Sequence, residues 1–467
     1  MKISYIQDIR QGKVFKKLFI LLILIYCSVS LYGQSVRTKL PNIVVIYVDD
    51  MGYGDLQSYG SEIPTPNIDR IGKDGIRFTD FYSAAPVCTP SRYALLTGKY
   101  PQRSKHNLTF ALMPEDKNYL DPSETTIAGY LKKVGYQTAI IGKWHLGLAE
   151  NTSPTGYGFD DFTGTTSGCV DYFTHSYGAR GRDWYVNDKP SVEKGYSTDL
   201  LTNHAIQFVN TQSIAGNPFF LYLPYNAPHY GKTNPDRIVD YTISLGKAQY
   251  KGLTDLNTLQ VPHKYIKRFL HIKDPYRRAY AAMVSSLDDN IGRLMEVLKK
   301  KKLLDNTIVW FISDNGGYSV SNFSHSSNGI LRGEKASLFE GGIRVPSMIS
   351  WKNKIKGNRV ESCMSINLDV LPTLMALAGA PPIEKSNIDG VDLSPLLLKN
   401  TMPSPRVLYW KFKDQQAMRK GEWKLILDKS GFQLFNLKND PQESNDLFHS
   451  QQDIVKKLKL LMFEKEL

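Results

Sequence analysis

Four runs of apolar residues divide the chain, and each predicts a buried strand. They are nearly continuous and rich in β-branched and aromatic side chains, and they cover residues 42–48 (NIVVIYV), 137–141 (QTAII), 218–223 (PFFLYL) and 307–313 (TIVWFIS). Strands without polar alternation are covered on both faces, which is typical of a parallel sheet.

Helical patterns lie between these runs. They cover residues 123–134, closed by Gly135, residues 198–211 and residues 279–302. In the last segment four apolar residues fall on one face at spacings of three and four: Leu287, Ile291, Leu294 and Leu298. Strands that alternate with helices predict a doubly wound α/β fold, in which ligands bind beyond the carboxyl ends of the strands.

The pattern changes near residue 401. Short apolar runs separated by Gly or charged turns follow at residues 407–412, 416–419, 423–427 and 432–436, and an amphipathic helix follows at residues 452–466. Such runs predict a small antiparallel sheet. We therefore predict a catalytic domain at residues 34–400 and a C-terminal subdomain at residues 401–467.

The first 33 residues predict a secretory signal peptide. Five basic residues and one acidic residue precede an apolar run at residues 18–26 (LFILLILIY), and small residues follow it. The run is shorter than the roughly 20 residues that a bilayer span needs, and no other segment is long and apolar enough. We expect export to the periplasm or the extracellular space without a stable membrane span; an uncleaved N-terminal anchor is the alternative.

Composition and charge narrow the choice of partners. The 467 residues are 42% hydrophobic and 22% charged, which excludes collagen-like and low-complexity architectures. The net charge of +13 includes four units from the predicted signal peptide, and it is compatible with nucleic acid, a membrane surface or an acidic substrate. Because no nucleic-acid-binding module is visible, we expect no nucleic-acid partner.

Polar side chains follow each predicted strand at the point where it ends. Asp49 and Asp50 follow the first, Lys143 and His145 the second, His229 the third, and Asp314 and Asn315 the fourth. Parallel strands bring these residues to one edge of the sheet. Three carboxylates and one amide oxygen suit a hard cation such as Ca²⁺ or Mg²⁺ better than zinc, and the neighbouring basic groups indicate that the site receives an anion.

The segment Cys88-Thr-Pro-Ser-Arg92 predicts the start of a short helix that ends at Gly98. Cys88 would lie at the helix N-terminus, where free N–H groups favour anions, and Arg92 one turn along. The alternative is a buried structural cysteine. Export leaves three cysteines, Cys88, Cys169 and Cys363, and an odd number in an oxidising compartment indicates a thiol with a special role.

Two of these segments resemble the signature segments of the formylglycine-dependent sulfatases, a branch of the alkaline phosphatase superfamily: PVCTPSRYALLTG at residues 86–98 and GYQTAIIGKWH at residues 135–145. The resemblance, strongest to secreted bacterial polysaccharide sulfatases, extends over nearly the whole mature chain. It includes VDDMGYGD (48–55), NAPH (226–229), SDNGG (313–317), GEKASLFEGGIRVP (333–346), DVLPTLMALAG (369–379) and FNLKNDPQESN (435–445). It implies an alkaline phosphatase-like, mostly parallel sheet flanked by helices, with a smaller C-terminal antiparallel-sheet subdomain.

The resemblance also implies cofactors and residue roles. A formylglycine-generating maturation enzyme would oxidise Cys88 to formylglycine (3-oxoalanine), which would leave Cys169 and Cys363 either paired or free. Ca²⁺ would be bound by Asp49, Asp50, Asp314, Asn315 and the modified Cys88. Arg92, Lys143 and Lys335 would offset the charge of a sulfate ester, His145 would act as a base, and His229 with Lys335 would protonate the leaving alcohol.

The substrate is less clearly marked. The irregular, aromatic-rich segment 164–190 holds Asp171, His175 and Arg180, which could orient sugar hydroxyls or a carboxylate, and His325 has the same potential. Internal packing of the segment is the alternative. Residues 231–274 predict an insertion that either rims the cleft or only connects.

Three functions are compatible with these features. We favour a secreted sulfatase that acts on a sulfated glycan, such as an algal galactan like carrageenan or a glycosaminoglycan. A phosphodiesterase or phosphonate hydrolase of the same superfamily is the second, and a catalytically silent glycan-binding protein with unmodified Cys88 is the third.

Overall fold

The computed structural model of the chain describes residues 39–148, 152–178, 181–232, 259–319 and 325–464. Their helices and strands all belong to one compact unit, Pro41–Leu467. The predicted signal peptide, Arg180 and most of the predicted insertion lie outside the described residues. Within the described part of the chain, no helix combines the length and the apolar character that a membrane crossing needs.

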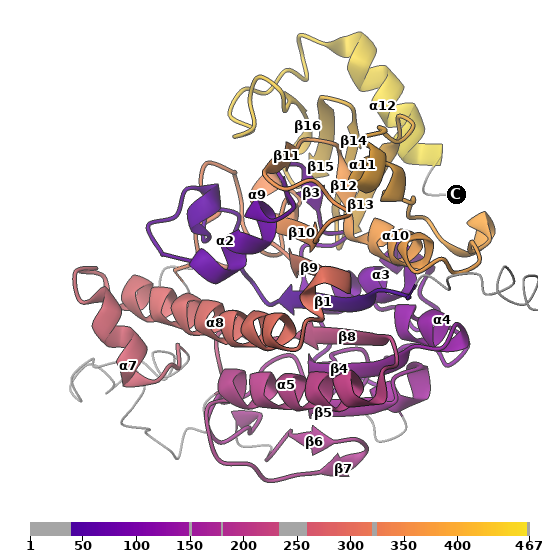
Figure 1. Cartoon of the computed structure of the whole chain (residues 1–467). Coiled ribbons are helices and arrows are strands. Elements are labelled where there is room, and N and C mark those ends of the chain that lie inside the picture. Colours follow the sequence, from indigo (N-terminus) through magenta and orange to yellow (C-terminus); the bar gives the residue numbers. More distant parts are fainter. Residues whose placement is uncertain (1–38, 149–151, 179–180, 233–258, 320–324, 465–467) are drawn as a thin grey trace, which may run out of the picture. The chain divides into compact units, whose positions relative to one another are not determined.

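A ten-stranded mixed sheet forms the centre of this unit (Figure 1), in the order β11-β2-β10-β9-β1-β8-β4-β5-β6-β7. Its middle is parallel, as the apolar runs predict, and consists of β9 (Thr307–Ser313), β1 (Asn42–Val48), β8 (Phe219–Pro224), β4 (Gln137–Lys143) and β5 (Asp161–Thr165). One edge adds β10 (Ser347–Trp351), β2 (Ile76–Phe78) and β11 (Arg359–Glu361), and the other adds β6 (Tyr185–Val186) and β7 (Lys189–Pro190). The predicted mostly parallel α/β fold is confirmed.

Helices cover both faces of the sheet. Alternate residues of β1, Val44, Ile46 and Val48, share one apolar core with α2 (Pro66–Lys73), α5 (Ser197–Ala215) and α8 (Pro275–Lys300). Tyr47 points to the other face, where its hydroxyl lies 2.6 Å from Ser91 Oγ of α3 (Cys88–Thr97). The same side holds α4 (Ile127–Lys133) and α10 (Val370–Leu377), which contact α3. Burial on both faces explains why β1 carries no polar alternation.

The predicted helices exist with shifted ends. α8 starts at Pro275, four residues before the predicted start, because Asp274 accepts hydrogen bonds from the N–H groups of Tyr276 and Arg277 and caps the helix. α4 starts four residues later than predicted, because Thr126 accepts from the N–H of Gly129 and caps it there. Capping therefore decides both starts.

A second sheet follows in the C-terminal part. Four antiparallel strands are adjacent in chain order: β13 (Val407–Phe412), β14 (Gln415–Lys420), β15 (Trp423–Asp428) and β16 (Gly431–Asn436). One face shares a core with β3 (Phe81–Tyr82) and β12 (Ser365–Ile366), and the other packs against α12 (Gln452–Glu464). The predicted antiparallel sheet is confirmed. Its inner face shares one core with residues of β3 and β12, such as Tyr82 and Ile366.

Candidate active site

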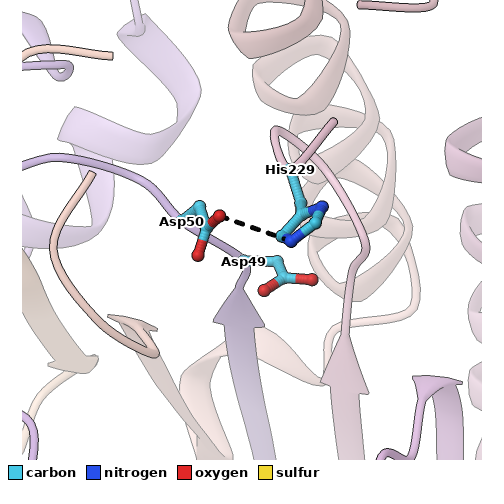
Figure 2. Close-up of side chains that lie close together, drawn as sticks. All are labelled: Asp49, Asp50 and His229. Carbon is cyan, nitrogen blue, oxygen red and sulfur yellow. Dashed lines mark ion pairs between the residues drawn. The ribbon is translucent and has the colours of Figure 1, made fainter. Parts of the chain in front are cut away.

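The ends of four parallel strands deliver the candidate catalytic residues to one edge of the sheet. Asp49 and Asp50 follow β1, Lys143 is the last residue of β4, His229 follows β8, and Asp314 follows β9. The structure therefore brings together residues that lie up to 265 positions apart in the chain. Figure 2 shows Asp49, Asp50 and His229 beyond the tip of β1, where their ligand atoms lie within 4.8 Å of one another.

The acidic side of the site is a buried group of oxygen atoms. The N–H of Asp50 donates to Asp314 Oδ1 at 3.1 Å, and the Asn315 amide donates to Asp50 Oδ1 at 2.7 Å. Asp49 Oδ1 and Asn315 Oδ1 are buried, and neither accepts a hydrogen bond from the described residues. Unsatisfied buried oxygens are costly, and a bound hard cation would satisfy them. The oxygen set of Asp49, Asp50, Asp314 and Asn315 thus fits a metal such as Ca²⁺.

The two carboxyl groups nearest Arg92 differ in pKa. Burial raises the pKa of Asp314 well above its usual value, and the charge of Asp49 adds to this effect. Burial also opposes ionisation of Asp49, but the neighbouring Lys143, and then His229 and Arg92, hold the pKa of Asp49 far below its usual range. The neighbouring cations therefore do not fully offset the repulsion between the buried carboxylates of Asp49 and Asp314. A metal ion bound between them would relieve this repulsion.

Three cations surround the acidic group. Lys143 Nζ lies 2.6 Å from Asp49 Oδ2, and Lys335 Nζ lies 2.7 Å from Asp50 Oδ2. Arg92 Nη2 lies 2.9 Å from Asp314 Oδ2 and 3.5 Å from Asp49 Oδ1. Burial lowers the pKa of the Lys335 ammonium, but the charges of Asp50, Cys88 and Asp49 together outweigh this effect, and the pKa rises. All three basic side chains are buried or nearly so, which makes the site suited to an anionic substrate.

His229 is neutral and its tautomer is fixed. Its Nδ1 lies 2.7 Å from the Tyr230 carbonyl oxygen and must donate to it, since a carbonyl only accepts. Nε2 therefore carries the lone pair, and Lys335 Nζ donates to it at 3.2 Å. Burial lowers the pKa of His229 to about 4, while Asp50 opposes and Lys335 adds to this shift. A proton of Lys335 thus lies in a hydrogen bond to His229 Nε2.

His145 is neutral in the opposite tautomer. Its Nε2 donates to the Leu112 carbonyl at 2.8 Å, and its buried Nδ1 has no hydrogen-bond partner among the described residues. Burial lowers the pKa of His145, and Lys143 lowers it further. A Cβ on Gly168 would lie 2.6 Å from His145 Cε1, so only glycine permits this ring position. His145 thus presents an unprotonated nitrogen that can accept a proton.

Cys88 is the first residue of α3, as predicted, and α3 ends at Gly98 in the left-handed conformation, with φ of 66°. The Cys88 side chain is buried, and it lies near enough to Arg92 and Lys335 to affect the pKa of both. The sequence leaves Cys169 and Cys363 either paired in a disulfide or free, and in the structure both are free thiols. Burial raises the pKa of each to about 11.

The contacts of two predicted substrate-binding residues, Asp171 and His175, are with residues outside this cluster. Asp171 is buried in its own turn, where it accepts from the N–H groups of Phe173 and Thr174 and from Gln260 Nε2 at 2.6 Å. His175 is fully buried and stacks on Trp184, with ring centroids 4.4 Å apart. These two residues hold the aromatic-rich segment together, as the internal-packing alternative has it.

His325 also makes contacts away from the strand ends. Its ring stacks on Tyr276 at 5.1 Å, and its Nδ1 lies 3.7 Å from Asp274 Oδ2. The carbonyl oxygen of His325 accepts from Arg277, which also pairs with Asp55 at 2.7 Å. In the described residues His325 therefore belongs to a network at the start of α8.

Other residues hold the backbone of the site in place by hydrogen bonds, and the pattern of apolar residues in the sequence does not reveal them. Ser91 Oγ lies 2.6 Å from the Ser83 hydroxyl and donates to the Asp314 carbonyl, and Thr89 Oγ1 donates to the His145 carbonyl at 3.0 Å. Gln415 of β14 donates to the Ala336 carbonyl and accepts from the N–H of Leu338, both at 3.1 Å. Ser91 and Thr89 lie inside the Cys88 motif and could have been suspected from it, whereas nothing in the sequence marks Gln415.

Comparisons with known proteins agree on one family. The family described as Sulfatase matches residues 41–380, and the one described as N-sulphoglucosamine sulphohydrolase, C-terminal, matches residues 333–466. Arylsulfatase J of Mus musculus is 32% identical over an alignment of 484 positions, gaps included. The alignment covers 90% of this chain and 75% of the relative. N-acetylgalactosamine-6-sulfatase of Homo sapiens is 32% identical over 411 residues, which cover 84% of this chain and 72% of the relative.

Solved structures share the fold along nearly the whole chain. The crystal structure of Ps i-CgsB in complex with k-i-k-neocarrahexaose is 33% identical, with a TM-score of 0.78, and the match covers 91% of this chain and 93% of that one. The structure of BT4656 in complex with D-glucosamine-2-N,6-O-disulfate is 26% identical, with a TM-score of 0.70, and the match covers 92% and 97%.

Proposed function

Because the chain belongs to the sulfatase family, and is therefore a sulfuric ester hydrolase, we propose that it is an exported enzyme that removes sulfate from a sulfated carbohydrate. We further propose that its nucleophile is formylglycine made from Cys88 by a maturation enzyme. The observation that carries this proposal is the position of Cys88 at the start of α3, near enough to Arg92 and Lys335 to affect the pKa of both. These two cations pair with Asp314 and Asp50 of the oxygen cluster.

A bound Ca²⁺ would be held by Asp49, Asp50, Asp314 and Asn315, together with the modified Cys88. Two buried oxygens of this set, Asp49 Oδ1 and Asn315 Oδ1, accept no hydrogen bond from the residues that the structure describes, which supports the assignment. When bound, the ion supplies positive charge that favours approach of a nucleophile to an anionic ester. A formylglycine hydrate at Cys88 would supply one hydroxyl for attack on sulfur and a second whose deprotonation would allow release of sulfate.

The residues of the chain bind and move protons around these groups. Arg92, Lys143 and Lys335 offset the charge of the sulfate oxygens. Lys335 and His229 hold the proton that the departing alcohol needs, which matters because a sugar alkoxide is a poor leaving group. His145, whose Nδ1 carries a free lone pair, accepts the proton that is lost when sulfate is released.

The carbohydrate class follows from the relatives. The structure of Ps i-CgsB holds a carrageenan oligosaccharide and that of BT4656 a sulfated glucosamine. These names support a sulfated galactan or a glycosaminoglycan as the substrate of this chain. Export is proposed from residues 1–33 alone, and N-terminal sequencing of the mature protein will test it.

Parallel assays test the reaction. The full chain, produced with a formylglycine-generating enzyme, is expected to hydrolyse 4-nitrophenyl sulfate faster than 4-nitrophenyl phosphate and to release sulfate from defined carrageenan or glycosaminoglycan oligosaccharides. The matched variant Cys88→Ala should keep the wild-type melting temperature and lose turnover. A clear preference for phosphate, or undiminished sulfate hydrolysis by Cys88→Ala, would overturn the proposal.

A further inference from the structure

A second charged feature lies at the opposite ends of the central strands, away from the active site. A cavity of about 580 Å³ is lined by Thr307, the first residue of β9, whereas the active-site Asp314 follows the last residue of that strand. A strand of this length spans roughly 20 Å. A cavity of about 670 Å³ adjoins it and shares Arg70, Lys73 and Asp74 with it. We call the two cavities together the distal groove; α2 and the C-terminal end of α8 contribute lining residues to it.

Cations dominate the lining of the distal groove. The larger cavity is lined by Arg70, Lys73, Arg77 and Arg359. The smaller cavity adds Lys299, Lys302 and Lys352. Against these stand three carboxylates, Asp69, Asp74 and Asp305.

The carboxylates are already engaged. Asp74 pairs with Arg70 at 3.1 Å and Asp305 with Lys352 at 2.5 Å. Asp69 accepts from the N–H of Ser58 and from Thr65 Oγ1. Three exposed lysines, Lys73, Lys299 and Lys302, have no ion pair with any of the described residues. These ammonium groups are available to an anionic ligand.

The number of cations exceeds what helix ends require. α2 ends at Lys73 and α8 at Lys300, and basic residues near a helix C-terminus are favourable. However, α8 runs into four successive lysines, residues 299–302, and the loop after β10 adds Lys352, Lys354 and Lys356. Like charges gathered on one surface repel each other and destabilise the compact state. A bound polyanion would offset this cost.

We propose that the distal groove binds a sulfated glycan chain at a second site, separate from the active site. The choice of ligand rests on the proposed function, while the groove and its charge do not. A long glycan held at the groove stays near the enzyme, so that the next sulfate ester meets the active site at a raised effective concentration. Single-stranded nucleic acid is less suited, because none of the described residues that line either cavity is an aromatic residue able to stack on bases.

Binding by variants of the full chain tests this site. The groove variant carries Lys73→Ser, Lys299→Ser and Lys302→Asn, where Asn suits the left-handed backbone of residue 302, with φ of 56°. The control variant carries Lys429→Ser, Lys456→Ser and Lys457→Ser, three exposed lysines of the C-terminal part. Both lose the same charge. All proteins also carry Cys88→Ala, so that binding is measured without turnover.

Affinity for ι-carrageenan, for heparin and for single-stranded DNA is measured by titration at several salt concentrations. Loss of one exposed ion pair weakens affinity by about 1.5- to 5-fold. The groove variant, which loses three lysines, is therefore expected to bind at least one of the two glycans roughly tenfold more weakly and with a smaller salt dependence. The control variant is expected to bind like the parent. Equal weakening in both variants, unchanged binding in the groove variant, or stronger binding of DNA than of either glycan would overturn the proposal.

The two proposals fail separately. In proteins that keep Cys88, hydrolysis of 4-nitrophenyl sulfate should be the same with and without the groove substitutions, because this small ester cannot reach both sites. A protein that binds glycans through the groove and hydrolyses no sulfate ester would contradict the proposed function and leave the groove intact. Loss of aryl sulfate hydrolysis in the groove variant at an unchanged melting temperature would contradict the separation of the two sites.

Discussion

Lys335 Nζ lies 3.2 Å from His229 Nε2 and donates to it, because His229 Nδ1 already donates to a carbonyl. Lys335 also contacts Asp50, which raises the pKa of its ammonium, while burial lowers the pKa of His229 to about 4. At neutral pH the shared proton therefore belongs to Lys335. The pair can deliver this proton to an alcohol that leaves on the His229 side of the site.

The first prediction concerns the leaving group. His229→Gln removes the group through which Lys335 passes its proton, so hydrolysis of sugar sulfates, whose alkoxide needs a proton, should fall by about a hundredfold or more. Hydrolysis of 4-nitrophenyl sulfate, whose phenolate leaves without one, should fall much less. Steady-state kinetics on both substrates measures the difference, with His271→Gln, an exposed histidine, as the control. An equal loss on both substrates would show that protonation of the leaving group does not depend on His229.

The second prediction concerns a positioning residue in the C-terminal sheet. Gln415 holds the backbone of Ala336 and Leu338, and Ala336, which has an unfavourable φ of 69°, directly follows Lys335. Gln415→Ala should lower kcat by about tenfold, because this factor corresponds to the free energy of the one or two neutral hydrogen bonds that are lost. KM for 4-nitrophenyl sulfate should change little.

The matched control for Gln415→Ala is Gln442→Ala, which alters an exposed glutamine. The loss in Gln415→Ala should be larger for sugar sulfates than for the aryl ester, as in His229→Gln. A variant that only loses thermal stability, with kcat unchanged on both substrates, would mean that Gln415 supports the fold and not Lys335.

The third prediction concerns metal removal. Chelation with EGTA should abolish turnover and lower the melting temperature, because the buried oxygens of Asp49 and Asn315 lose their partner. Added Ca²⁺ at a hundred times its dissociation constant should restore about 2.7 kcal/mol of stability. Asn315→Ala should show a smaller Ca²⁺-dependent shift. A melting temperature that does not respond to Ca²⁺ or EGTA would contradict the assignment of the oxygen cluster.

The fourth prediction concerns stability in acid. Burial lowers the pKa of His175 below its usual value of 6.5, so the folded state holds this proton less tightly than the unfolded state. The stabilising contribution of the neutral ring is full above pH 6.5 and declines as the pH falls below that value. Each such histidine contributes a slope of at most about 1.4 kcal/mol per pH unit.

Urea denaturation between pH 7.5 and 4.5 measures this slope in the wild type and in His175→Phe, which keeps an aromatic ring against Trp184. The free energy of unfolding of the variant should fall less steeply below pH 6.5. Identical slopes would mean that His175 is protonated as readily in the folded protein as in the unfolded chain.

The central sheet and the core of the site could be predicted because few physical signals determine them. A run such as residues 42–48 has no polar alternation, which indicates burial on both faces, and a parallel sheet then sends Asp49 and Asp314 to one edge. The helix at Cys88 was marked by Pro90 and Gly98. Local signals and one rule of topology were sufficient for these features.

Other features depend on contacts that no local pattern records. Asp171 and His175 have side chains suited to binding sugars, but the aromatic segment around them folds inward, and both are buried. Gln415 reaches Ala336 across 79 positions, and the tautomers of His145 and His229 depend on the carbonyls of Leu112 and Tyr230. Tertiary packing, not residue type, decides these roles.

The mass of one peptide tests the central claim most directly. Trypsin releases residues 78–92, which contain Cys88 as their one cysteine, because Arg77 and Arg92 flank this segment. In protein produced with a formylglycine-generating enzyme, we predict a peptide about 18 Da lighter than the unmodified one, in a fraction that rises in proportion to sulfatase activity. Full activity in protein whose Cys88 peptide has the unmodified mass would contradict the account.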